Sequence, residues 1–248
     1  MNKKEKVKDY ISKHKYFSLS QISNELSLDK KIVKDYLFQL KKENLLFEAG
    51  YGMYSNIEKR FCLVPKSRVN TILNFLKKEF PYTEFIIWNT QQLQPLYYYT
   101  QQHHITFIEV EKEALTAFFE AVSKNYRDTL LERKEKDYFN SFEITRNPVV
   151  IRNLFSRSPK KGYFPELEKI LVDMFVDLDS YRYISLSDYR KIWDGLFSEF
   201  RIKIGFLYYY SKRRKCFEKL FSHLTGVSGG YGIDLCQIIE ESGKSLSI

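Results

Sequence analysis

The sequence has 248 residues, 44% of them hydrophobic and 17% aromatic, so a packed core is expected and global disorder is excluded. The formal net charge of +9 favours an anionic partner, with nucleic acid ahead of a membrane surface. No apolar stretch follows the charged N-terminus, and no run approaches the roughly 18 apolar residues of a membrane helix. We therefore expect a soluble, cytoplasmic protein.

The first part of the chain predicts three helices followed by a β-hairpin. Apolar residues at helical spacing indicate helices over Lys3–Lys13 and Lys30–Glu43. Ser18 is a candidate N-cap for a short helix between them, and Asp29 for the third helix. Two short strands between residues 45 and 54 flank a glycine that suits a tight turn. This order is typical of a winged helix-turn-helix, and we place the domain boundary near residue 60.

The rest of the chain alternates predicted strands with predicted helices, which is typical of an α/β layer structure with a partly parallel sheet. From Pro165 onward the pattern becomes helical, and it ends in a glycine- and serine-containing tail around an apolar patch at 233–239. The predicted fold is α/β (mixed α+β), with a winged helix-turn-helix over residues 1–60 and a mixed α/β domain with a helical C-terminal part over 61–248. The elements expected in that second domain are a helix over 67–80, strands over 85–88 and 105–110, a helix over 114–122, a short strand over 129–132, a strand over 149–151, and helices over 165–178, 186–200 and 203–223.

The outer face of the third helix carries the candidate DNA contacts. In a winged helix this helix enters the major groove, and the hairpin contacts the backbone or the minor groove. Lysines can pair with phosphates, tyrosine hydroxyls can donate to them, and a glutamine can recognise adenine. Two other interpretations stay open: a solvated helix face, and a winged helix that binds protein. The predicted contacts are Lys30, Lys31, Lys34, Tyr51 and Tyr54 at phosphates and Gln39 at a base edge.

A second basic and aromatic stretch lies near the C-terminus. The run Tyr208–Tyr210 precedes Lys212–Lys215, and aromatic groups with basic neighbours occur both in protein interfaces and in base-stacking surfaces. Core packing is the alternative for at least one tyrosine in the run. We predict a partner-binding surface that includes Tyr210, Lys212, Arg213 and Arg214.

Patterns typical of catalysis are weak. Glu109 and Glu111 suggest one face of a strand in a metal-dependent nuclease, but the lysine follows Glu111 immediately rather than two residues later. Asp173 lies four residues from both Lys169 and Asp177, which favours an ion-pair ladder on a helix surface. The histidines and cysteines are not spaced as metal ligands. We therefore expect no enzyme activity, no cofactor and no metal, and keep the nuclease as a minor alternative.

Four stretches, distributed from about residue 5 to residue 224, resemble the antitoxins of AbiE-type abortive-infection systems, known as type IV toxin–antitoxin systems. The wing sequence Gly50–Tyr54 is similar to the glycine–tyrosine wing of that family. The stretch Leu167–Asp173 matches a Leu-Glu-Lys-x-Leu-Val-Asp pattern and is the most specific. The other two are Ile87–Thr90 with the following Gln101-Gln102 and Phe107–Lys112, and the late-helix stretch Tyr210–Arg214.

The resemblance implies a repressor that binds double-stranded DNA at its own promoter through the N-terminal domain. It also implies that the C-terminal domain opposes a partner toxin with a nucleotidyltransferase fold. A tyrosine-rich segment over residues 93–102 departs from the family, which has a Phe-x-x-His pattern ahead of a Gln-Pro pair there. The main alternative is a protein-interaction module without sequence-specific DNA binding.

Overall fold

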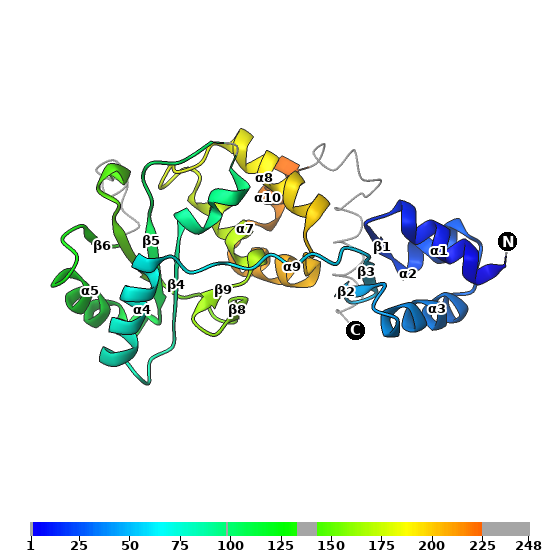
Figure 1. Cartoon of the computed structure of the whole chain (residues 1–248), viewed down its shortest axis with the longest axis horizontal. Coiled ribbons are helices and arrows are strands. Elements are labelled where there is room, and N and C mark those ends of the chain that lie inside the picture. The colour runs from blue at the N-terminus through cyan, green and yellow to red at the C-terminus, as the bar shows by residue number, and fades with distance from the viewer. Residues whose placement is uncertain (1, 98, 133–142, 225–248) are drawn as a thin grey trace. The chain divides into compact units, whose positions relative to one another are not determined.

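The computed structural model describes residues 2–97, 99–132 and 143–224, so the predicted apolar patch at 233–239 lies outside the described residues. The protein has a mixed α/β structure, as the sequence predicts (Figure 1). It divides into two compact units. Unit 1 comprises Met1–Phe61 together with the chain from Arg190 onward, and unit 2 comprises Cys62–Tyr189.

Unit 1 begins with three helices and a small antiparallel sheet. Among the described residues, β1 pairs with β3, and β3 pairs with β2, so the sheet order is β1-β3-β2. The sequence predicts the hairpin of β2 and β3 but not β1, which has only three residues and no alternation of buried and exposed positions. The elements are α1 (Lys3–Lys13), β1 (Tyr16–Ser18), α2 (Leu19–Glu25), α3 (Lys30–Lys42), β2 (Phe47–Gly50) and β3 (Met53–Ser55).

The predicted helix caps of unit 1 are present. The side chain of Ser18 accepts a hydrogen bond from the backbone N–H of Gln21, and Asp29 accepts one from the backbone N–H of Lys31. Each cap satisfies a backbone donor that the helix itself leaves without a partner. The apolar faces of the three helices then bury a common core, which includes Val7, Ile22, Val33, Leu37 and Leu40.

The C-terminal helices of the described chain belong to unit 1. They are most of α8 (Leu186–Glu199), then α9 (Ile204–Arg213) and α10 (Phe217–Leu224). The side chain of Tyr16 joins them to the N-terminal sheet: its hydroxyl donates to the carbonyl of Phe200 at 2.9 Å and accepts from the N–H of Ile202 at 3.0 Å. The sequence prediction assigned all residues after 60 to a second domain, because a contact between distant segments leaves no local pattern.

The predicted helix over residues 203–223 is two helices in the structure. Lys215, between α9 and α10, has a φ of 55°, and the backbone N–H of Cys216 turns back to the carbonyl of Ser211. A left-handed residue ends an α-helix, and here it is a lysine rather than the glycine that usually marks such an end. The break therefore has no strong signal in the sequence.

Unit 2 is built on a sheet of order β4-β5-β7-β6 within the described residues. Strand β4 is antiparallel to β5, whereas β7 is parallel to both of its neighbours, β5 and β6. Helix α7 begins two residues later than predicted, because Pro165 pairs with Lys160 in a small hairpin. The elements are α4 (Ser67–Glu79), β4 (Phe85–Asn89), η1 (Thr90–Leu96), β5 (Thr106–Val110), η2 (Lys112–Ala114), α5 (Leu115–Ser123), β6 (Thr129–Leu131), η3 (Ile144–Arg146), β7 (Val149–Asn153), β8 (Lys160–Lys161), β9 (Phe164–Pro165) and α7 (Leu167–Asp177).

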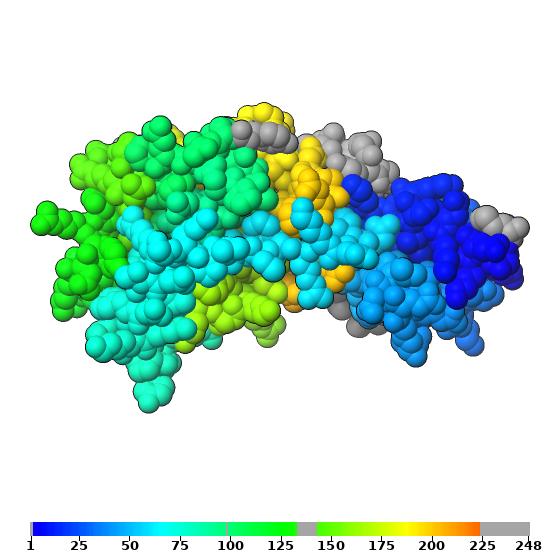
Figure 2. Space-filling model, viewed as in Figure 1, coloured from blue at the N-terminus to red at the C-terminus, as the bar shows by residue number. Residues whose placement is uncertain are grey.

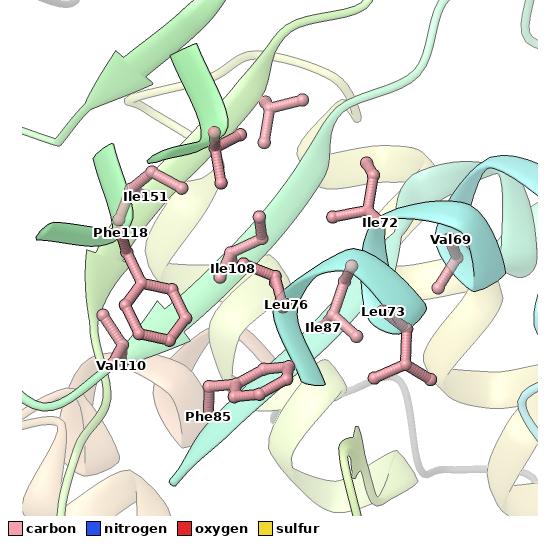
Figure 3. Packing of buried hydrophobic residues seen from close by; sticks show 12 residues of the cluster. Val69, Ile72, Leu73, Leu76, Phe85, Ile87, Ile108, Val110, Phe118 and Ile151 are labelled. Carbon is pink, nitrogen blue, oxygen red and sulfur yellow. The ribbon is translucent and has the colours of Figure 1, made fainter. Parts of the chain in front are cut away.

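One face of this sheet is apolar. Leu76 of α4 and Phe118 of α5 pack against Phe85 and Ile108 of the strands (Figure 3). Side chains alternate between the two faces of a strand, so Glu109 of β5 projects from the opposite face. Every residue of β4 and β5 is buried, which means that both faces of these strands are covered.

Candidate nucleic-acid interface

Helix α3 has one buried face and one exposed basic face. Val33, Leu37 and Leu40 are buried in the core of unit 1, and α3 lies at the surface of that unit (Figure 2). All four predicted contact residues of this helix are exposed: Lys30, Lys31, Lys34 and Gln39. Within the described part of the chain, none of these three lysines has an ion pair with a carboxylate. The same side of α3 carries one exposed acid, Asp35, so its lysines leave the exposed face with a net positive charge.

An aromatic side chain interrupts the basic face of α3. Phe38 is 57% exposed, and the ammonium group of Lys42 lies 4.5 Å from the centre of its ring. A single exposed apolar side chain is ordinary on a protein surface, so Phe38 alone does not indicate a ligand there.

The hairpin of β2 and β3 positions the two predicted wing tyrosines differently. Tyr51 lies at its tip, beside Gly52 with a φ of 68°, and is 64% exposed. Tyr54 is half-buried, and its ring stacks on that of Phe17 with centroids 6.4 Å apart. Burial, and then the charge of Glu48, raise the pKa of the Tyr54 hydroxyl. Tyr51 is thus free to contact a ligand, whereas much of Tyr54 serves the core.

The predicted partner-binding surface on α9 needs one correction. Tyr210 is completely buried, so it packs inside unit 1 and cannot contact a partner in this structure. Lys212 is exposed, and Arg213 and Arg214 are half-exposed. The aromatic residues that α9 does expose are Phe206, at 44%, and Tyr209, at 37%. The sequence alone does not indicate that Phe206 is exposed, because burial along a helix depends on which face meets the rest of the unit.

The pair Glu109 and Glu111 does not form the site that a metal-dependent nuclease needs. Glu109 is completely buried in β5, whereas Glu111 lies beyond the end of that strand and is exposed. The carboxylate of Glu109 is held by Arg152 at 3.0 Å and by Lys169 at 2.6 Å. Among the described residues, no group of three or more His, Cys, Asp or Glu side chains could hold a metal ion. The geometry therefore gives no support to the nuclease alternative.

The predicted surface ladder of Lys169, Asp173 and Asp177 is wrong, because all three residues are buried. Lys169 pairs with both Glu109 and Asp173, and Arg152 donates to both carboxylate oxygens of Asp177 at 3.0 and 2.9 Å. Glu109 and Arg152 are register partners on parallel strands, so their side chains project side by side. Lys169, Asp173 and Asp177 follow one another at intervals of about one turn of α7. They therefore lie in a row along the helix face that covers Glu109 and Arg152.

This buried ion cluster, which we define as Glu109, Arg152, Lys169, Asp173 and Asp177, holds α7 against the sheet of unit 2. Burial opposes ionisation of Glu109, but Lys169 and then Arg152 lower the pKa of its carboxyl group. Burial likewise disfavours a charged Arg152, yet Asp177, Glu109 and Asp173 raise its pKa. The charged groups thus stabilise one another, which is the condition for keeping them inside a protein.

The chain belongs to a family of unknown function, DUF6577, whose model matches residues 32–227. The matched range begins inside α3 and extends past α10, so it includes elements of both units and leaves out α1 and α2. No curated protein and no solved structure matches the sequence. Within the described ranges, no helix is long and apolar enough to cross a membrane.

Proposed function

We propose that this protein is a DNA-binding transcriptional regulator, and that unit 1 binds double-stranded DNA through α3 as a winged helix does. The observation that carries the proposal is the exposed, net basic face of α3, where Lys30, Lys31 and Lys34 outnumber Asp35. The element order α1-β1-α2-α3-β2-β3 supports it, because a third helix followed by a β-hairpin is the arrangement that winged helices use on DNA.

The dimensions of α3 suit the major groove. Its 13 residues make a rod roughly 20 Å long, and the major groove of B-DNA, about 12 Å wide, admits one helix. In this arrangement the lysines near the helix N-terminus pair with phosphates, which fixes the register of the helix on the duplex. Gln39, further along the exposed face, then lies toward the base edges, where its amide can form two hydrogen bonds with adenine.

The hairpin adds contacts to the DNA backbone. The hydroxyl of Tyr51 at its tip donates to a phosphate, and the half-buried Tyr54 fixes the hairpin on the core through Phe17. The formal net charge of +9 draws the protein toward DNA from a distance, since long-range attraction raises association rates. We propose the cytoplasm as its location, since a repressor acts where its promoter is.

Charge reversal on α3 tests this function. We expect Lys30→Glu, Lys31→Glu and Lys34→Glu, combined in one variant, to weaken binding to promoter DNA and to lower the slope of log K against log salt by about three, one for each lost phosphate contact. Fluorescence anisotropy over a salt series measures both quantities. The matched control reverses three exposed lysines of unit 2, Lys78, Lys124 and Lys161. Equal affinity and equal slopes for the two variants would reject α3 as the docking helix.

The more specific form of the proposal is an autorepressing antitoxin that opposes a nucleotidyltransferase-fold toxin, and it rests on the sequence resemblance. Exposed Phe206 and Tyr209 on α9, near Lys212, favour a protein partner as well as DNA. Co-expression with the product of the adjacent gene tests this form. Rescue of growth and co-purification, both lost in a Phe206→Ser, Tyr209→Ser variant, would support it. A neighbouring protein that neither harms growth nor binds would contradict it.

A further inference from the structure

Two arginines that are far apart in the sequence lie together in unit 1. The backbone N–H of Arg201 donates to the carbonyl of Lys59 at 2.8 Å, and its guanidinium Nε donates to the carbonyl of Ile57 at 3.1 Å. The guanidinium carbon also lies 4.3 Å from the centre of the Phe47 ring in β2. Arg60 directly follows Lys59 in the sequence, and its side chain is exposed. We call Arg60 and Arg201 the arginine pair.

The arginine pair concentrates positive charge that other residues do not neutralise. Burial lowers the pKa of Arg201, and the nearby charge of Arg60 lowers it further, while Glu58 acts weakly in the opposite direction. Among the described residues, neither arginine has a carboxylate within ion-pair distance. The adjacent acid Glu199 is already paired with Lys59 at 3.0 Å. Two like charges held close together this way are typical of a site that receives an anion.

A helix N-terminus adds to the positive potential beside β2. Helix α9 begins at Ile204, and no side chain caps it. Its first turn meets the end of β2 so closely that a Cβ atom added to Gly50 would lie 3.2 Å from the backbone nitrogen of Gly205. Unsatisfied backbone N–H groups and the helix dipole favour negative charge at such an end. Strand β2 is thus contacted by Arg201 at Phe47 and by the start of α9 at Gly50.

We propose that the arginine pair binds a backbone phosphate of the DNA, so that the DNA-binding surface of unit 1 continues from the hairpin onto the segment that joins α8 to α9. This inference rests on the proposed function. The planar guanidinium group matches phosphate with two parallel hydrogen bonds, which a lysine cannot do. Arg201 is held in place by Phe47 and Ile57, which leaves its terminal nitrogens available, and Arg60 supplies a second cation from the exposed side.

The test compares Arg60→Glu with Arg127→Glu in the full chain. Both arginines are exposed, and both variants change the net charge equally. Arg127 lies in unit 2, so it serves as the control for a general effect of charge. For Arg60→Glu we expect about tenfold weaker binding to promoter DNA at physiological salt, and a salt slope smaller by about one. Arg60→Lys should keep the slope. Arg201→Lys should weaken binding while circular dichroism shows an unchanged fold.

The outcomes separate this inference from the proposed function. If the α3 lysine variant loses affinity but Arg60→Glu and Arg127→Glu bind equally well, the arginine pair is not a phosphate site and the function stands. If both single variants weaken binding to the same extent, the effect is a general one of net charge, and the inference is also overturned. If the wild-type chain does not bind the DNA at all, the inference and the proposed function fail together.

Discussion

At the scale of single residues, two glycines set how closely α9 approaches the hairpin. A Cβ atom at Gly50 would lie 3.2 Å from the nitrogen of Gly205, whereas one at Gly205 would lie 3.5 Å from the Cα of Gly50, which is ordinary contact. The two positions therefore differ in what they tolerate, although they touch each other. Of the two glycines in the hairpin, Gly52 has the positive φ that the turn requires and Gly50 does not.

We predict that Gly50→Ala destabilises the protein by about 1–2 kcal/mol, because the added methyl group forces backbone atoms apart in a packed region. Gly205→Ala should leave stability unchanged or raise it by up to about 1 kcal/mol, because alanine favours the helix. Urea unfolding of both variants measures the difference. Gly195→Ala in α8, where no atom lies within 4 Å of the new Cβ, is the control for helix propensity. A Gly50→Ala variant as stable as Gly205→Ala would show that the contact is loose.

The buried ion cluster is the feature for which the sequence pattern is most misleading. Lys169, Asp173 and Asp177 have the spacing of an exposed ladder, and that spacing is the same whether the helix face meets water or a sheet. What buries them is Glu109 with Arg152, and that pairing comes from a parallel register between strands with a long connection. No local pattern encodes the register, so the cluster could not be found from the sequence.

We predict that Glu109→Gln costs about 3–5 kcal/mol of unfolding free energy, because it leaves Lys169 and Arg152 buried with one carboxylate fewer. Asp9→Asn, which breaks an exposed ion pair with Lys13, should cost less than about 0.5 kcal/mol. The pKa of Glu109 is lowered in the folded protein, so its ionised form stabilises the fold above the ordinary value of 4.5, and this contribution is lost as pH falls toward the lowered pKa.

Wild-type stability should therefore decline below about pH 4.5, and the decline should be shallower in Glu109→Gln, which has no carboxyl group to titrate there. Urea unfolding at a series of acidic pH values provides the comparison. Parallel pH profiles for the two proteins would mean that Glu109 does not titrate in this range between the folded and unfolded states.

At the scale of elements, the sequence predicts a helix or strand well where the spacing of its apolar residues matches one buried face. Helices α3 and α4 follow apolar spacing and end within a residue or two of the expected bounds. Strands β4 and β5 are short and mostly apolar, as expected for strands covered on both faces, with Glu109 of β5 as the charged exception. The prediction fails where tertiary contacts decide: β1 exists through its pairing with β3, and the break before α10 lies at a left-handed lysine.

The candidate site follows the same division. The sequence supplied the exposed lysines of α3, since an amphipathic helix determines which residues face outward. It also placed Tyr210 on a surface, and the structure buries that residue completely, because α9 packs with its tyrosine-rich side partly inward. Arg60 and Arg201 lie about 140 residues apart in the sequence, in segments with no pattern that links them, and only the fold brings them together.

At the scale of the whole molecule, the N-terminal elements form one compact unit with the chain from Arg190 onward. Unit 1 takes in the helices after Arg190, and the contacts between its two segments involve buried groups. The ring of Tyr16 lies 5.6 Å from that of Phe197, and its hydroxyl has two backbone partners in the second segment. If unit 1 binds DNA as we propose, the C-terminal helices support the same unit that carries the DNA contacts.

We predict that a fragment of residues 1–61 is much less stable than unit 1 in the intact protein. In the fragment, Tyr16 and the side of the hairpin that packs on the C-terminal helices become exposed to water. This exposure lowers the free energy of unfolding by about 2–3 kcal/mol, which in a fragment of this size lowers the melting temperature by roughly 10 °C or more. Joining residues 190–224 to the fragment through a flexible linker should restore the lost stability. Thermal unfolding by circular dichroism makes the comparison. A fragment as stable as the joined form would show that the C-terminal helices are not needed.

The central claim is that this protein recognises its own promoter, and its most direct test is binding of the purified full chain to that DNA over a salt series, with scrambled DNA as control. The account predicts binding to the promoter about a thousandfold or more tighter than to the scrambled sequence, together with a steep loss of affinity as salt increases. Equally weak binding to both DNAs would contradict it, and would favour a protein-interaction module in which α3 serves as part of the scaffold.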